Sequence, residues 1–243
     1  MSIQHGNSKL GKLIHTWTLP SGLKKICVGA STVCLAICYA MQNHFTRPKV
    51  KEAHERNYKE SLRKDFVATM SRDLREKFVR IMRIHAGGEF YSAAYVRKWI
   101  AIAERNPSVL FFAYTRSWAD SEVLPSLREL SRMPNVVLWW SCDRASKAPP
   151  RVKGIRRAYL MSSDDDIPRY HVDLVFRNKR KTTLKWVDDA IVCPAENGVT
   201  STTCSQCQLC FRSKPVPIHR KFVELGVANS ISVEKPSYLQ TIS

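Results

Sequence analysis

Short apolar runs alternate with longer amphipathic segments through the middle of the chain. A continuous apolar run is typical of a strand in a parallel sheet, because both faces of such a strand are covered. The predicted strands cover residues 13–19, 78–86, 109–115, 136–141, 155–161 and 172–176. Since helices are predicted between several of them, the pattern favours a parallel α/β sheet.

Helical periodicity occupies the segments between these strands. Residues 50–81 are charged and free of Gly and Pro, and we expect a second helix to begin within them near Ser71. Residues 92–105 and 124–131 are also predicted helices. The later connections are too short for full helices, which disfavours a closed eight-stranded barrel. The predicted fold class is therefore α/β, a partial (β/α) barrel or open parallel sheet with a C-terminal cysteine-rich metal-binding segment.

Three parts are expected along the chain. Residues 1–192 form the α/β domain, and residues 193–212 form the cysteine-rich segment. Residues 213–243 contain several prolines with weak periodicity and are expected to be a loose C-terminal tail.

Composition adds a strong positive charge. Of 243 residues, 39 are Lys or Arg and 21 are Asp or Glu, a net charge of +18 at pH 7. A hydrophobic share of 44% is ordinary for a globular protein. Because such a charge attracts polyanions, a nucleotide or nucleic acid is the expected substrate or partner. The alternative is that the charge only aids solubility.

A first group of cysteines has the spacing C-x6-C-x3-C over Cys27, Cys34 and Cys38. Three thiolates on one loop can hold three corners of a cubane iron–sulfur cluster and leave one iron open to a small ligand. A zinc site and simple packing of three thiols are the alternatives.

The same segment has no charged side chain between residues 26 and 41 and follows Lys24 and Lys25, as a signal anchor would. It is shorter than the roughly 20 residues that span a bilayer. We therefore expect a buried metal-binding loop, no membrane association and a cytoplasmic location, with a membrane anchor as the alternative.

A second group of cysteines has the spacing C-x10-C-x2-C-x2-C and comprises Cys193, Cys204, Cys207 and Cys210. Four thiolates can saturate a cubane or fill a tetrahedral zinc site, so a second [4Fe–4S] cluster or Zn is predicted here. Cys142 stands alone and is expected to be a packed thiol.

Gly87, Gly88 and Glu89 follow a predicted strand and precede a predicted helix. Ligands of parallel sheets bind at the carboxyl ends of strands, and glycines there let a ligand approach the backbone closely. The adjacent carboxylate can receive an ammonium group. The alternative is a tight turn with a solvated Glu.

Together, these features resemble the radical S-adenosylmethionine (SAM) superfamily. In that superfamily a three-cysteine loop after the first strand of a partial barrel binds a [4Fe–4S] cluster, and a Gly-Gly-Glu motif after the second strand holds the amino group of SAM. The resemblance implies that Glu89 and the Gly87–Gly88 backbone bind this group and that the cluster ligands are Cys27, Cys34 and Cys38. The usual spacing is C-x3-C-x2-C with an aromatic residue before the third cysteine; here the spacing is wider and Tyr39 follows it.

Further cofactor contacts are expected at other strand ends. Arg116 or Arg144 can pair with the SAM carboxylate, and Ser141 or Asp143 can contact its ribose. Each of these residues can instead be a helix cap or a solvated loop residue.

A narrower resemblance is to the gene product 88 family of phage and plasmid proteins. It rests on Ile37-Cys38-Tyr39-Ala40-Met41, on the block from His85 to Trp99, and on the ending from Cys193-Pro194 to Cys210-Phe211. It covers roughly residues 13–212.

The sequence thus predicts a radical SAM-type iron–sulfur enzyme. It would cleave SAM to a 5′-deoxyadenosyl radical, draw its electron from an unidentified donor, and act on an unknown substrate, with a nucleotide or nucleic acid as the first candidate. No catalytic residue is assigned. The alternative is a non-enzymatic, zinc-stabilised nucleic-acid-binding protein of phage or plasmid origin.

Overall fold

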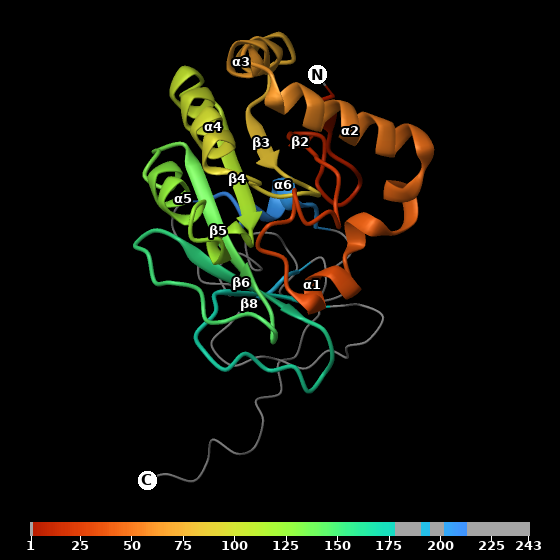
Figure 1. The fold of residues 1–243 in the computed structure, drawn as a ribbon, viewed down its shortest axis with the longest axis vertical. Helices are drawn as coiled ribbons and strands as arrows, with labels where there is room; N and C mark the ends of the chain where they lie inside the picture. The colour runs from red at the N-terminus through yellow and green to blue at the C-terminus, as the bar shows by residue number, and fades with distance from the viewer. Residues whose placement is uncertain (1, 178–190, 195–201, 213–243) are drawn as a thin grey trace. The chain divides into compact units, whose positions relative to one another are not determined.

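An open, mostly parallel sheet forms the centre of the protein in the computed structural model, which describes residues 2–177, 191–194 and 202–212 (Figure 1). Its eight strands follow one another in chain order, and neighbours from β2 to β8 are parallel, whereas β1 is antiparallel to β2. Their bounds are β1 Gln4–His5, β2 Ile14–Trp17, β3 Ile81–Ile84, β4 Leu110–Thr115, β5 Val136–Cys142, β6 Arg156–Met161, β7 Leu174–Arg177 and β8 Ile191–Val192.

The helices lie largely in the crossovers between strands. They are α1 Thr32–Ala36, α2 Pro48–Leu62, α3 Phe66–Glu76, α4 Ala93–Arg105, α5 Leu124–Leu130 and α6 Cys204–Cys207, with 3-10 turns at Tyr39–Met41, Asn43–Thr46 and Ser117–Ala119. Each crossover between parallel strands steps one position in the same direction. Because such crossovers are right-handed, their helices cover the same face of the sheet. Figure 1 shows α4 and α5 side by side along β3, β4 and β5.

Two apolar clusters bury the two faces of the sheet. The larger cluster includes Trp17, Trp99 and Trp140 and packs under the helices. The smaller includes Trp139 and Phe211 on the opposite face. Trp139 and Trp140 are consecutive in β5 and point to opposite faces, as the alternation of a strand requires. The C-terminal segment 202–212 therefore packs on the face that the crossover helices do not cover.

All six predicted strands occur, as β2 to β7. The open sheet with β1 and β8 at its edges agrees with the predicted α/β architecture and with the rejection of a closed barrel. The helix predicted over 92–105 is α4, and Ser92 caps it by accepting a hydrogen bond from the backbone N–H of Tyr95 at 3.2 Å.

The predicted start of a helix near Ser71 is wrong. The chain leaves the helical conformation at Arg63, and α3 begins at Phe66. Ser71 lies inside α3, where its buried hydroxyl accepts a hydrogen bond from Nδ2 of Asn106 at 3.0 Å. The residue that resembled a cap is therefore a packing contact between α3 and the end of α4.

The described part of the chain contains no helix that is both long enough and apolar enough to cross a membrane. The uncharged segment 26–41 instead forms a loop, the five-residue helix α1 and a 3-10 turn. Residues 2–212, as far as they are described, belong to one compact unit that ends at Ser213. The predicted loose tail, 213–243, lies outside the described residues.

Candidate cofactor and metal sites

The carboxyl ends of four neighbouring strands bring most of the predicted site residues together. The loop with Cys27, Cys34 and Cys38 follows β2, and Gly87 to Glu89 follow β3. Arg116 follows β4, and Asp143 follows β5. Since these strands are parallel neighbours, the four loops meet at one edge of the sheet.

Local hydrogen bonds shape the cysteine loop. Ile26 is fully buried, and its backbone N–H and that of Cys27 both donate to the carbonyl of Leu23, at 2.9 and 2.8 Å. Ser31 then caps α1, because its hydroxyl oxygen accepts a hydrogen bond from the N–H of Cys34 at 3.0 Å. The loop therefore has a defined path between the core and α1.

The three thiols of this loop are partly buried and lie within electrostatic reach of one another. Burial raises the pKa of Cys27 to about 12 and that of Cys34 to about 11, and the nearby groups that add to this increase include Glu89 and the Cys38 thiol. Burial also raises the pKa of Cys38. Thiols of this kind stay protonated near neutral pH unless a metal displaces the proton.

The two glycines let the cysteine loop pack against the end of β3. A Cβ atom at Gly87 would lie 2.8 Å from Oγ of Ser21 and 2.9 Å from Cβ of Ala40. Gly88 has φ of +79°, and a Cβ there would lie 2.5 Å from Cβ of Leu19. The N–H of Gly88 donates to Oγ of Ser21 at 2.9 Å. A side chain at either position would therefore displace the neighbouring loop, and Gly88 also has a left-handed φ that glycine adopts freely.

Glu89 turns its carboxylate toward the next strand end. Oε2 accepts hydrogen bonds from the hydroxyls of Thr115, at 2.6 Å, and Ser117, at 3.2 Å, and Oε1 accepts one from the N–H of Arg116 at 2.9 Å. Burial raises the pKa of this carboxyl group. A carboxylate offers about four acceptor positions, and the described residues fill three of them, which leaves one position on Oε1 for a further donor.

A buried ion pair connects the remaining loops. Arg116 is 4% exposed and Asp143 0%, and Nη1 of Arg116 lies 2.8 Å from Oδ2 of Asp143. The same oxygen accepts a hydrogen bond from the hydroxyl of Ser31 at 2.5 Å. Through Ser31, Asp143 and Arg116, the cap of the cysteine helix is linked to the backbone that binds Glu89. Ser31 has a capping pattern in the sequence, but nothing there indicates its distant partner.

The remaining residues predicted to contact SAM are Arg116, Ser141 and Arg144. Arg116 is bonded to Asp143 and also donates to the Ser146 hydroxyl at 3.2 Å, so its pairing with a SAM carboxylate stays a prediction. Ser141 is partly exposed, and its carbonyl accepts a hydrogen bond from Nε1 of Trp118 at 2.8 Å. Arg144 is exposed. Cys142 is fully buried, as expected for a packed thiol.

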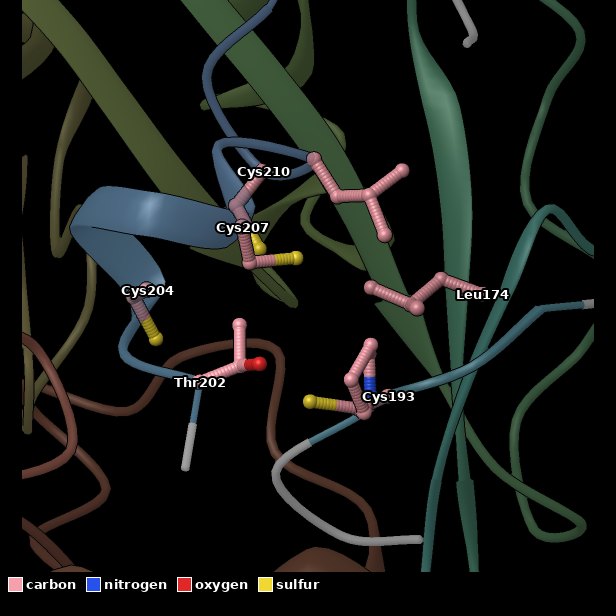
Figure 2. A pocket seen from close by; sticks show the side chains of 8 residues that line it. Leu174, Cys193, Thr202, Cys204, Cys207 and Cys210 are labelled. Atoms are coloured by element: carbon pink, nitrogen blue, oxygen red, sulfur yellow. The ribbon is translucent and has the colours of Figure 1, made fainter. Parts of the chain in front are cut away.

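The second cysteine group lies elsewhere, on the face of the sheet opposite the crossover helices. Cys193 follows β8, Cys204 and Cys207 belong to α6, and Cys210 follows the left-handed residue Gln208. All four cysteines line one pocket beside Leu174, and Figure 2 shows their side chains around its space. Within the described ranges, no three or more His, Cys, Asp or Glu side chains are already arranged to hold a metal ion.

The sequence of this chain is similar to those of two mycobacteriophage proteins. The chain is 28% identical over 229 residues to the Gene 88 protein of Mycobacterium phage L5, with 86% of this chain and 87% of the phage protein covered. It is 25% identical over 230 residues to the Gene 88 protein of Mycobacterium phage D29, with the same coverage. No solved structure matches it. The family model described as Gene product 88 matches residues 1–213, and the chain therefore belongs to the gene product 88 family.

Proposed function

We propose that this protein is a radical SAM-type iron–sulfur enzyme acting on a nucleotide or nucleic-acid substrate. The observation that carries the proposal is the meeting of the Cys27–Cys34–Cys38 loop and Glu89 at one edge of a parallel sheet whose strands follow in chain order. The three thiols come from one loop, and the carboxylate comes from the next strand.

Topology supports this assignment. The cysteine loop follows β2, the first strand of the parallel series, and the Gly-Gly-Glu turn follows β3, the second. This is the order in which the superfamily places its cluster loop and its SAM amino-group site. Gly87 and Gly88 pack closely against the loop, and Cys27 and Cys34 lie within electrostatic reach of Glu89.

The donor set also suits the cofactors. Three thiolates leave one iron of a cubane free, and the open acceptor position on Glu89 suits an ammonium N–H. When bound, a reduced [4Fe–4S] cluster with SAM supplies one electron, taken from an external donor, that cleaves SAM into methionine and a 5′-deoxyadenosyl radical able to abstract hydrogen.

The chain's own residues would position this chemistry. Cys27, Cys34 and Cys38 would hold the cluster, and Glu89 would orient SAM through its amino group. The Arg116–Asp143 pair would hold the cysteine loop against the ends of β4 and β5, because Asp143 also binds Ser31 of that loop. The net charge of +18 supports an anionic substrate, because it raises the local concentration of polyanions.

Metal analysis after anaerobic purification tests the first step of this proposal. We expect brown protein that contains iron and acid-labile sulfide, and we expect Cys34→Ser to lose the iron bound at this loop. Cys142→Ala is the matched control, since its thiol is buried in β5, and it should keep the wild-type iron content. Colourless protein that holds only zinc and binds nucleic acid would overturn the enzyme proposal in favour of a zinc-stabilised nucleic-acid-binding protein.

A further inference from the structure

A second group of ligating side chains lies away from the edge just described. The thiols of Cys193, Cys204, Cys207 and Cys210 border one pocket of about 350 Å3, part of it open to solvent (Figure 2). The Cys210 thiol lies within electrostatic reach of the other three thiols. The pocket therefore brings four metal-ligating groups, from two segments of the chain, to one accessible place.

The backbone around these thiols is fixed by the sheet. Nε1 of Trp139 donates to the carbonyl of Cys210 at 2.8 Å, and Nη2 of Arg156 donates to the carbonyl of Arg212 at 2.7 Å. The rings of Phe112 and Phe211 are 5.4 Å apart. These contacts hold the C-terminal end of the cysteine segment against β4, β5 and β6.

The other end of the segment is bound to the N-terminal loop. The N–H groups of Cys204 and Ser205 donate to the carbonyls of Lys9 and Leu10, at 2.8 and 3.0 Å. Thr203 forms a capping box with Gln206, which starts α6 at Cys204. As a result, the thiols of α6 are presented to the pocket by a short helix that is fixed at both ends.

A partly buried cation lies on the same face of the sheet as this group. Arg83 projects from β3 on the same side of the sheet, and its guanidinium lies 5.7 Å from the ring centre of Tyr114. Nη2 donates to the Tyr39 hydroxyl at 3.2 Å, but the buried Nε atom has no hydrogen-bond partner among the described residues. The ionisable groups within electrostatic reach of Arg83 include two phenols, Tyr39 and Tyr114, and two thiols, Cys204 and Cys210.

We propose that Cys193, Cys204, Cys207 and Cys210 bind a four-thiolate metal centre and that Arg83 balances its negative charge. Four thiols would each release a proton to solvent and form four sulfur–metal bonds, either to Zn2+ or to the irons of a [4Fe–4S] cluster. In both cases the centre is an anion. A half-buried anion requires a nearby positive charge, and Arg83 supplies it.

Binding would also close the pocket. The four cysteines line its wall, and metal binding would require their side chains to turn toward a common centre. This would join the chain just after β8 to α6, since Cys193 follows the first and Cys204 and Cys207 belong to the second. The proposal does not depend on SAM chemistry, because none of the four residues belongs to the edge that carries Glu89.

A full-length variant with Cys27, Cys34 and Cys38 all changed to Ser isolates this second centre. We expect it to retain either about one Zn2+, or about four irons with sulfide, per chain. Adding Cys204→Ser and Cys207→Ser should abolish that metal. Absence of stoichiometric metal from the triple variant, or retention of it after the two additional changes, would overturn the proposal. Failure of the wild-type chain to cleave SAM would leave this result unaffected.

Thiol alkylation of the wild-type chain provides a measurement that needs no variant to fold. We expect Cys193, Cys204, Cys207 and Cys210 to be protected from alkylation in the metal-loaded protein and to react after a chelator removes the metal. Equal alkylation rates before and after chelation would contradict the centre.

The charge-balancing role of Arg83 has its own test. We expect Arg83→Met to lose the metal to a chelator about tenfold faster than the wild type, as for other residues that support metal ligands. Arg83→Lys should restore slow release. Arg80→Met, at an exposed position near the start of the same strand, is the matched control and should release metal at the wild-type rate. Equal release rates for Arg83→Met and Arg80→Met would contradict the role of Arg83.

Discussion

The carboxylate of Asp143 is bound through both oxygens, and Oδ1 accepts hydrogen bonds from the N–H of Ala145 at 2.9 Å and the hydroxyl of Ser146 at 3.1 Å. Oδ2 pairs with the buried guanidinium of Arg116 at 2.8 Å and accepts a hydrogen bond from Ser31 at 2.5 Å. A buried charge that loses its partner costs far more than an exposed one, because water cannot replace the partner. At the scale of single residues, this pair is therefore the contact on which the geometry of the site depends most.

Replacing Asp143 with Asn should lower the free energy of unfolding by about 3–5 kcal/mol, since it leaves Arg116 charged and buried. Denaturant unfolding monitored by circular dichroism measures this change. Asp65→Asn is the control, because the Arg63–Asp65 pair lies at the surface with more than half of each side chain exposed, and it should leave stability almost unchanged. Equal effects of the two substitutions would contradict the structural role of the buried pair.

His85 is a second buried polar residue with a measurable consequence. Nε2 lies 3.1 Å from the Tyr95 hydroxyl, and the other ring nitrogen has no hydrogen-bond partner among the described residues. Burial, together with the charge of Arg83, lowers the pKa of His85 to about 3. The unfolded chain therefore binds a proton at this residue below about pH 6.5, while the folded chain does not until about pH 3.

Stability should consequently fall as the pH drops from about 6.5 toward 3. Between pH 7 and pH 5, His85 alone should account for a loss of about 2 kcal/mol. His85→Asn removes this part of the loss, and Asn tolerates the left-handed φ of 62° at this position. Urea unfolding at the two pH values measures the difference. Parallel pH profiles for wild type and variant would show that His85 does not carry the effect.

Among the elements, the turn after β3 determines how closely the cysteine loop can approach. Gly88 and Gly154 both have a left-handed φ, of +79° and +87°. A Cβ atom at Gly88 would meet the Leu19 side chain at 2.5 Å, whereas a Cβ at Gly154 would have nothing within 4 Å. Comparing substitutions at the two glycines therefore separates the destabilisation caused by a left-handed φ from that caused by a steric clash.

We expect Ala at position 154 to destabilise the protein by about 1–2 kcal/mol through backbone strain alone. Ala at position 88 should cost about 1–3 kcal/mol more, because the cysteine loop must move away. Unfolding midpoints of Gly88→Ala and Gly154→Ala in the same denaturant give the comparison. A Gly88→Ala variant as stable as Gly154→Ala would mean that the loop does not depend on this close contact.

The sequence predicts the longer elements well because each has a local signal. Continuous apolar runs identify β4 and β5, and the helical spacing of apolar residues over 92–105 identifies α4. The two-residue strands β1 and β8 and the four-residue helix α6 are too short for any periodicity. The sequence places the start of a helix near Ser71 because Ser71 followed by Asp73 resembles a cap, whereas Ser71 lies inside α3 with its hydroxyl buried against Asn106.

Across the whole molecule, the contacts that the sequence does not predict are those between residues far apart along the chain. The cysteine spacings and the Gly-Gly-Glu turn are local patterns and could be recognised directly. Ser31 and Asp143 are 112 positions apart, and the sequence does not connect them. The place of Arg83 beside the second cysteine group depends likewise on the sheet register and on the packing of residues 202–212.

Release of 5′-deoxyadenosine tests the central claim most directly. Protein reconstituted anaerobically with iron and sulfide would be incubated with SAM and a low-potential reductant. We predict that the wild type accumulates 5′-deoxyadenosine and that Glu89→Gln requires roughly tenfold to a hundredfold more SAM, as expected for the loss of one hydrogen bond to a charged group. Absence of 5′-deoxyadenosine from wild-type protein that carries a full complement of iron and sulfide would contradict the account.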